Sequence, residues 1–173
     1  MAGNYIENQR DWGNVKYGFK DMAYSGCEII ATYNALISLG NRSYRITDLI
    51  QHYEKSGAAL RGGFGIAPSA PARFFVKKGY KVRKTFSREK AKIDSFGEQN
   101  ATFLVTFYWD KEDASKQLHT VNISKSPAGF IVHNAYQKNA EGIFIANSPK
   151  STLGEAIYSI AAKVSPIVIY GIS

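Results

Sequence analysis

The chain has 173 residues, a formal net charge of +8 and a single cysteine. This length fits one domain with its own hydrophobic core, and one cysteine excludes a disulfide framework and any zinc site built from several cysteines. Charges interrupt every apolar run before it reaches the length of a membrane span, and the N-terminus lacks the basic and apolar regions of a signal peptide. We therefore expect a single domain over residues 1–173 with neither a membrane span nor a signal peptide.

Helical spacing of apolar residues dominates the first half of the chain, after an irregular arm over residues 1–22. From Ser25 to Leu39 the apolar positions recur every three to four residues, with Ser25 as the expected N-cap and Gly40 as the stop. Further along, the sequence predicts a helix over 47–55, a glycine-rich loop and then a helix ending at Gly79, a strand over 81–86 and a surface helix beginning at Ser87.

The second half of the chain reads mainly as β-structure. Its predicted elements are strands over 101–109, 118–124, 129–136 and 142–147, a helix over 151–163 and a closing strand over 166–173. Helices first and strands later predict an α+β domain, in which N-terminal helices pack against a C-terminal antiparallel sheet.

Cys27 is the residue that points to chemistry, because it follows Gly26 in the first turn of a predicted helix. A thiol there faces unpaired backbone N–H groups and the positive end of the helix dipole, and both favour the thiolate. A nucleophilic cysteine also needs a base, usually a histidine. The chain offers three candidates, which are His52, His119 and His133.

His119 is the preferred partner for Cys27. His52 lies inside a predicted helix and is interpreted as a surface or packing residue. His119 begins one predicted strand, and a short Pro- and Gly-containing link joins it to the next strand as a hairpin. This hairpin would bring His119 near Asn134, whose side-chain amide could fix the tautomer of the ring. Two ordinary polar residues at strand ends explain the same pattern, so the spacing alone leaves both interpretations open.

The segments "NQRDWGNVKYG…YSGCEIIATYNAL", "GGFGIAPSAPARFFVKKGYKV" and "LHTVNISKSPAGFIVHNAY" together resemble the papain-like cysteine peptidases, in particular the bacteriocin-processing branch that cleaves double-glycine leader peptides. The resemblance spans almost the whole chain and implies a papain-like fold with Cys27 as nucleophile and His119 as general base and acid. It further implies that Asn134 orients His119. Gln9 and the Cys27 backbone N–H would form the oxyanion hole.

Two positions depart from the pattern of that family. Glu28 follows the cysteine where many relatives have glycine, and no proline separates Asp11 from Trp12 in the arm. A carboxylate beside the thiol is expected to oppose its ionisation, unless it points away along the helix.

Peptide hydrolysis is the expected reaction, while a deamidase or a transglutaminase-like acyltransferase would use the same thioester. A non-catalytic peptide-binding module of the same fold is the alternative from another class.

Basic residues concentrate between Arg73 and Lys92, where nine of the 22 fall together with a single acid, Glu89. A solvated surface explains this stretch in the ordinary way, and a docking surface for an acidic protein is the sharper hypothesis. The sequence "RGGFG" (61–65) lacks the lysine and Ser/Thr of a phosphate loop. We therefore expect neither nucleic acid nor a membrane as a partner.

We expect a monomeric domain. Its expected partners are a protein or peptide substrate and an acidic protein. Small domains that resemble this family also occur as effector or toxin domains of long secreted bacterial proteins. That resemblance implies a fragment acting in the cytoplasm of a target cell, and a neutralising immunity-type protein as the acidic partner. We expect no cofactor and no metal, because no spacing of His, Asp or Glu residues fits a metal site.

Overall fold

The centre of the fold is a five-stranded antiparallel sheet with the strand order β3-β7-β4-β5-β6. The computed structural model describes residues 4–56, 66–108, 118–135, 140–142, 148–161 and 166–173. Strands β4, β5 and β6 pair in sequence, whereas β7 returns to lie between β3 and β4. The strands are β3 (Val82–Thr85), β4 (Thr102–Tyr108), β5 (Leu118–Ser126), β6 (Gly129–His133) and β7 (Pro166–Ile172).

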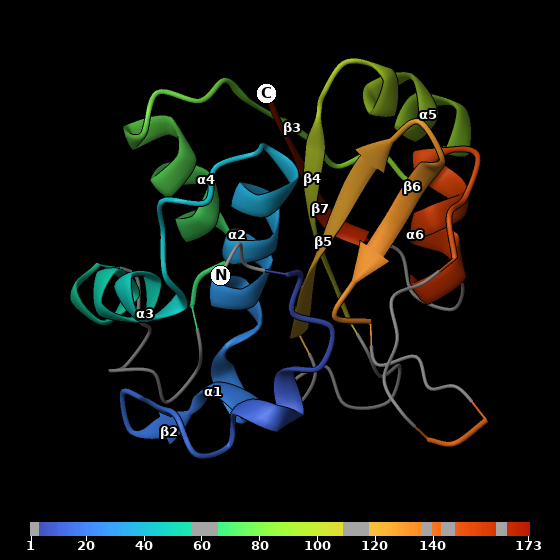
Figure 1. The fold of residues 1–173 in the computed structure, drawn as a ribbon. Coiled ribbons are helices and arrows are strands. Elements are labelled where there is room, and N and C mark those ends of the chain that lie inside the picture. Colours follow the sequence, from blue (N-terminus) through green and yellow to red (C-terminus); the bar gives the residue numbers. More distant parts are fainter. Residues whose placement is uncertain (1–3, 57–65, 109–117, 136–139, 143–147, 162–165) are drawn as a thin grey trace.

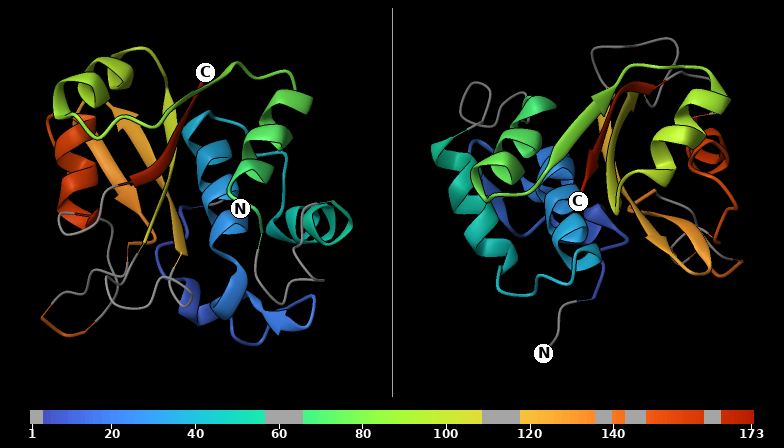
Figure 2. Two further views of the ribbon diagram at one scale, coloured as in Figure 1. Left: turned by 180° about the vertical axis from the view of Figure 1, so that it is seen from behind. Right: turned by 90° about the horizontal axis from the view of Figure 1, so that it is seen from above.

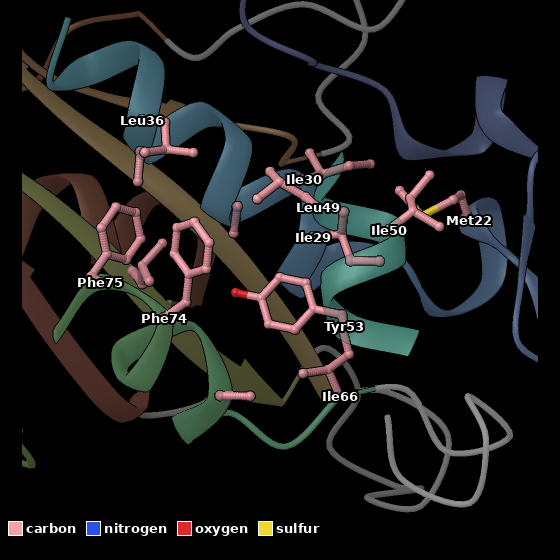
Figure 3. Close-up of a cluster of buried hydrophobic side chains, with 14 of the residues drawn as sticks. Met22, Ile29, Ile30, Leu36, Leu49, Ile50, Tyr53, Ile66, Phe74 and Phe75 are labelled. Carbon is pink, nitrogen blue, oxygen red and sulfur yellow. The ribbon is translucent and has the colours of Figure 1, made fainter. Parts of the chain in front are cut away.

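Helices cover both faces of this sheet (Figures 1 and 2). Helices α2 (Cys27–Ser38) and α4 (Ser69–Lys77) lie on one face, and α3 (Ile46–Lys55) packs against α2 on the side away from the sheet. Figure 3 shows their core, in which Ile29 and Leu36 of α2 pack with Tyr53 of α3 and Phe75 of α4. Because α2 also contacts β4 and β5, it is buried on nearly all sides, which explains why its sequence is apolar beyond one stripe.

The other face of the sheet is covered by α5 (Lys90–Glu98) and α6 (Leu153–Ala161). Alternate residues of β4, such as Phe103 and Val105, point into this second core, while Leu104 between them joins the first. The two helices approach closely at Gly97, where an added Cβ would lie 2.8 Å from Cβ of Leu153. The sheet therefore separates two hydrophobic cores and contributes side chains to both.

The N-terminal arm runs into the helical layer through four short elements. These are η1 (Gln9–Trp12), β1 (Lys16–Tyr17), β2 (Lys20–Asp21) and α1 (Met22–Ser25). Before η1, Ile6 is bound to the middle of α2, because its backbone N–H and C=O each hydrogen bond with the side-chain amide of Asn34 at 2.9 Å. The arm also contacts the end of β6, where Oε1 of Glu7 lies 2.7 Å from Nδ1 of His133.

The predicted elements that lie in the described residues are present, with some shifted boundaries. Ser25 is not the N-cap of the cysteine helix. Its hydroxyl bonds back to the carbonyl of Asp21 at 3.2 Å, and it ends the separate helix α1, so that Gly26 takes the N-cap position of α2. The surface helix predicted from Ser87 begins at Lys90, because Ser87 caps a turn by accepting from the N–H of Glu89 at 3.2 Å.

Two expected segments, the glycine loop at 61–65 and most of the strand at 142–147, lie outside the described residues. Within the described part of the chain, no helix is both long enough and apolar enough to cross a membrane.

Candidate active site

Cys27 is the first residue of α2 and is buried. The chain reaches it through Gly26, whose N–H bonds to the carbonyl of Met22 at 3.0 Å. A Cβ on Gly26 would lie 2.5 Å from that carbonyl oxygen and 2.8 Å from the Met22 sulfur. A glycine is therefore required at this junction, because α1 and α2 follow each other with no room for a side chain.

The Cys27 thiol is held in its protonated form. Its Sγ lies 3.0 Å from Oε2 of Glu28, and burial followed by the Glu28 carboxylate raises the pKa of Cys27 well above its usual value. Hydrogen bonds from the backbone N–H groups of Thr120 and Glu28 oppose this rise but do not reverse it. Burial and the neighbouring carboxylate thus act against the thiolate that the helix start was expected to favour.

Glu28 points toward the thiol and the sheet, and not away along the helix. It is buried, and its Oε1 accepts a hydrogen bond from Oγ1 of Thr120 at 3.2 Å. Oγ1 of Thr120 also lies 2.9 Å from Oγ1 of Thr106 on β4. Burial raises the pKa of Glu28 to about 7, although the hydrogen bonds from Cys27 and Thr120 favour the charged form. The carboxylate therefore joins the start of α2 to the sheet.

His119 is the second residue of β5 and is buried against Phe107, with the two ring centroids 5.8 Å apart. Its Nε2 lies 2.9 Å from the main-chain oxygen of Asn134. Because a carbonyl only accepts, Nε2 must carry the hydrogen, which assigns the tautomer. Burial lowers the pKa of His119 to about 4, so the ring is neutral at neutral pH.

Asn134 contacts His119 through its backbone, where the sequence predicted a contact through the side chain. The residue follows β6 with a φ of 63°, a left-handed conformation that asparagine tolerates better than most residues. This conformation turns its carbonyl toward the ring. Its side chain pairs instead with Gln9, as Oδ1 accepts from the Gln9 N–H at 2.9 Å and Nδ2 donates to Oε1 at 3.3 Å.

Gln9 is buried between Asn134 and the segment that precedes Cys27. Its Nε2 donates to the carbonyl of Ala23 in α1 at 3.0 Å. An amide nitrogen carries two hydrogens, so this bond accounts for one of them. The four residues singled out from the sequence are thus connected: Cys27 meets β5 at Thr120, beside His119, and Gln9 joins Asn134 to α1.

These contacts lie at one end of the molecule. In Figure 1 the start of α2, the start of β5 and the end of β6 all lie toward the lower edge, next to α1 and η1. No group of three or more His, Cys, Asp or Glu side chains among the described residues could hold a metal ion. The groups that the contacts above place at this end are a thiol, a carboxylate, an imidazole and amides.

His133 belongs to a second polar network, which the sequence did not reveal. Its Nδ1 lies 2.7 Å from Oε1 of Glu7 and its Nε2 lies 2.8 Å from Oγ of Ser124, while Tyr5 stacks on the ring at 3.7 Å. Glu7 also accepts the backbone N–H of Asn134 at 3.1 Å through Oε2. Ser124 and His133 are both buried, so this network anchors the arm and fixes Asn134. His52, in contrast, packs edge-on against aromatic rings, as predicted.

Comparison with known proteins bears on the fold. No protein-family model matches the sequence, and a search of curated proteins finds no match. Among solved structures, the peptidase domain of Streptococcus ComA, a bifunctional ABC transporter involved in a quorum-sensing pathway, is similar to this chain. The match has a TM-score of 0.52 and 9% sequence identity, and it covers 85% of this chain and 90% of that chain. The predicted α+β, papain-like fold is confirmed.

Proposed function

We propose that this chain is a thiol-dependent peptidase domain in which Cys27 attacks the acyl carbon of a peptide bond. One observation carries the proposal: the sole cysteine begins α2 and meets β5 at the residue after His119, whose ring is hydrogen bonded to Asn134. A solved structure with the same fold is itself a peptidase domain.

In the proposed reaction, Sγ of Cys27 forms a tetrahedral intermediate and then a thioester as the amine leaves. His119 serves as general base and acid. Its Nε2–H is held by the carbonyl of Asn134, which leaves Nδ1 as the nitrogen with a lone pair. The backbone N–H of Cys27 and the second amide hydrogen of Gln9 are the donors proposed for the oxyanion.

The electrostatics favour a neutral resting site. The pKa of Cys27 is raised well above its usual value and the pKa of His119 is lowered to about 4, both mainly by burial. A thiol and a neutral imidazole are then the resting forms, and not a thiolate–imidazolium pair. The thiol proton must leave during the attack itself, which makes the identity of its acceptor important.

Deamidation and acyl transfer remain part of the proposal, because the same thioester leads to hydrolysis or transfer according to which nucleophile arrives second. We extend the proposal to a setting as an effector or toxin domain with an acidic neutralising partner. The exposed basic residues between Arg73 and Lys92 support an acidic partner on electrostatic grounds.

The test is a mass-spectrometric comparison of a cell lysate incubated with wild-type protein, with Cys27→Ala and with Ser95→Ala. Ser95 is exposed on α5, so its variant is a control for an unrelated substitution. New peptide termini are expected with wild type and Ser95→Ala and not with Cys27→Ala. Deamidated side chains or cross-links would select the alternative reactions. If folded wild type and Cys27→Ala give the same spectra, the chain is not this enzyme.

A further inference from the structure

Glu28 is placed to act on the nucleophile directly, and we infer that it accepts the proton of the Cys27 thiol at the first step of the reaction. This inference rests on the proposed function and assigns to Glu28 both proton transfers of the first half-reaction, from the thiol and to the leaving amine. It leaves His119 as base and acid of the second half-reaction, in which water cleaves the thioester.

The first argument is geometric. A general base must lie within hydrogen-bond reach of the proton that it removes, and Oε2 of Glu28 lies 3.0 Å from Sγ of Cys27. Both side chains are buried, and they are neighbours in the first turn of α2. The proton can therefore pass between them without movement of the backbone.

The second argument is that the sheet holds the carboxylate in place. Thr120 of β5 donates its hydroxyl to Oε1 of Glu28 at 3.2 Å, and Thr106 of β4 lies 2.9 Å from that hydroxyl. One carboxylate oxygen is thus bound to the sheet and the other to the thiol. A base fixed in this way by a third group is the arrangement expected of an activated nucleophile.

The third argument concerns the titratable groups around Glu28 and the pKa of its carboxyl group. Among the described residues, the titratable groups that interact with it electrostatically are Cys27 and the buried phenols of Tyr17 on β1 and Tyr53 on α3. Glu54 in turn acts on Tyr17, and Arg73 acts on Tyr53. Burial raises the pKa of Glu28 to about 7, which suits a proton acceptor at neutral pH.

The imidazole is a weaker base than this carboxylate. Burial lowers the pKa of His119 to about 4 and raises the pKa of Glu28 to about 7, so the carboxylate is the stronger base. The Nε2–H of His119 is also committed to the carbonyl of Asn134. Geometry and basicity therefore agree on Glu28 as the first acceptor.

The step balances as follows. As the bond from Sγ to the acyl carbon forms, the thiol proton moves to Oε2 of Glu28 and the carbonyl π electrons move to oxygen. When the intermediate collapses, the C–N bond breaks and the proton passes from Glu28 to the leaving amine. The products are the thioester, a neutral amine and the ionised Glu28 carboxylate, with no net gain or loss of protons.

The first experiment follows alkylation of Cys27 by iodoacetamide against pH in wild type, Glu28→Gln and His119→Gln. The chain has one cysteine, so the label reports on that thiol alone. Glu28→Gln removes the negative charge and should lower the alkylation midpoint by about one pH unit or more. His119→Gln should keep the wild-type midpoint. An unchanged midpoint in Glu28→Gln, or a larger shift in His119→Gln, would overturn the inference.

A matched pair of variants at Thr120 gives the same information without altering Cys27 or Glu28. Thr120→Val removes the hydroxyl that donates to Glu28, and this favours the protonated carboxyl. The alkylation midpoint of Cys27 should therefore fall, as in Glu28→Gln, but by less. Thr120→Ser keeps the donor and should keep the midpoint. If the valine and serine variants give identical profiles, the carboxylate is not held as described. This pair also decides the question if Glu28→Gln does not fold.

The second experiment measures turnover of a peptide substrate found in the lysate comparison. Glu28→Gln should lose about 100-fold or more in kcat, although its thiol alkylates faster than wild type at neutral pH. Equal or faster turnover would mean that Glu28 only suppresses the thiol. A wild-type protein that cleaves nothing would contradict the proposed function, whereas the alkylation profiles would still decide whether Glu28 holds the thiol proton.

Discussion

At the scale of single residues, Asn134 is expected to act on His119 through its main chain, since its carbonyl contacts Nε2 while its side chain binds Gln9. We predict that Asn134→Gly keeps more activity than Asn134→Ala. Glycine adopts the φ of 63° freely, whereas alanine is strained there by about 1–2 kcal/mol. Both variants lose the contacts to Gln9, so the comparison isolates the backbone.

The measurement is kcat/KM together with the urea midpoint for both variants. If Asn134→Gly were as inactive as Asn134→Ala while both fold, the side-chain amide would be the group that matters. Asn134 would then act through its side-chain bonds to Gln9, and the contact of its carbonyl with His119 would be incidental.

Two buried titratable residues should make opposite contributions to the pH dependence of stability. The pKa of His119 falls to about 4 from 6.5, so the unfolded chain takes up a proton first and stability is lost as pH falls from about 6.5 to about 4. The pKa of Glu28 rises to about 7 from 4.5, so stability is lost as pH rises from about 4.5 to about 7. Each shift corresponds to ~3 kcal/mol, and the two nearly cancel.

The contribution of His119 to the pH dependence of stability should appear in Glu28→Gln, and that of Glu28 in His119→Gln. Relative to wild type, the free energy of unfolding of Glu28→Gln should rise with pH across this window by up to ~3 kcal/mol, and that of His119→Gln should fall. Urea titrations at several pH values compare the variants directly, and the remaining carboxylates form a common background. Parallel curves for wild type and both variants would contradict the burial of these groups in solution.

At the scale of elements, the junction between α1 and α2 sets the position of the nucleophile. We predict that Gly26→Ala destabilises the protein by about 1–3 kcal/mol, because its Cβ would lie 2.5 Å from the carbonyl oxygen of Met22. Gly13→Ala is the matched control, since its Cβ would meet nothing closer than 3.9 Å and its φ of −63° suits alanine. Thermal unfolding of both variants measures the difference.

The Gly26 variant should also lose activity if the junction positions Cys27. A folded, fully active Gly26→Ala protein would show that the two helices can separate without moving the thiol. A destabilised Gly13→Ala would instead point to a general sensitivity of the arm.

At the scale of the whole molecule, the basic stretch from Arg73 to Lys92 runs along α4, β3 and α5, away from the residues of the candidate site. Its nine basic side chains are exposed. The ordinary explanation is a solvated surface, whose charges also protect β3, an edge strand that pairs only with β7 in the described part of the sheet. The alternative is a docking surface for an acidic protein.

We predict that Lys81→Glu with Lys84→Glu weakens binding to poly-glutamate and flattens its salt dependence, because both charges lie within this stretch. Lys16→Glu with Lys55→Glu changes the net charge equally elsewhere and is the control. Turnover of a small peptide should be unchanged in both. If the two double variants bind alike, only net charge matters, and self-association of the Lys81/Lys84 variant would support edge protection.

Much of the fold could be predicted from the sequence, because helices and strands follow from local spacing. The period of apolar residues marked α2 and α3, and the hairpin between β5 and β6 brought His119 near Asn134 through neighbouring strands alone. The placement of Cys27 at a helix start was local in the same sense. These features depend on residues within about twenty positions of one another.

Only the tertiary structure decided the electrostatics and the polar contacts of the site. Glu7 reaches His133 and Gln9 reaches Asn134 across more than 120 residues, which no local pattern encodes. The direction of Glu28 depends on Thr120 of a distant strand. The pKa of Cys27 rises because packing removes water from it, and desolvation depends on every neighbour in space. The sequence by itself determined which groups are present and where the chain turns, and packing decided which of them are charged.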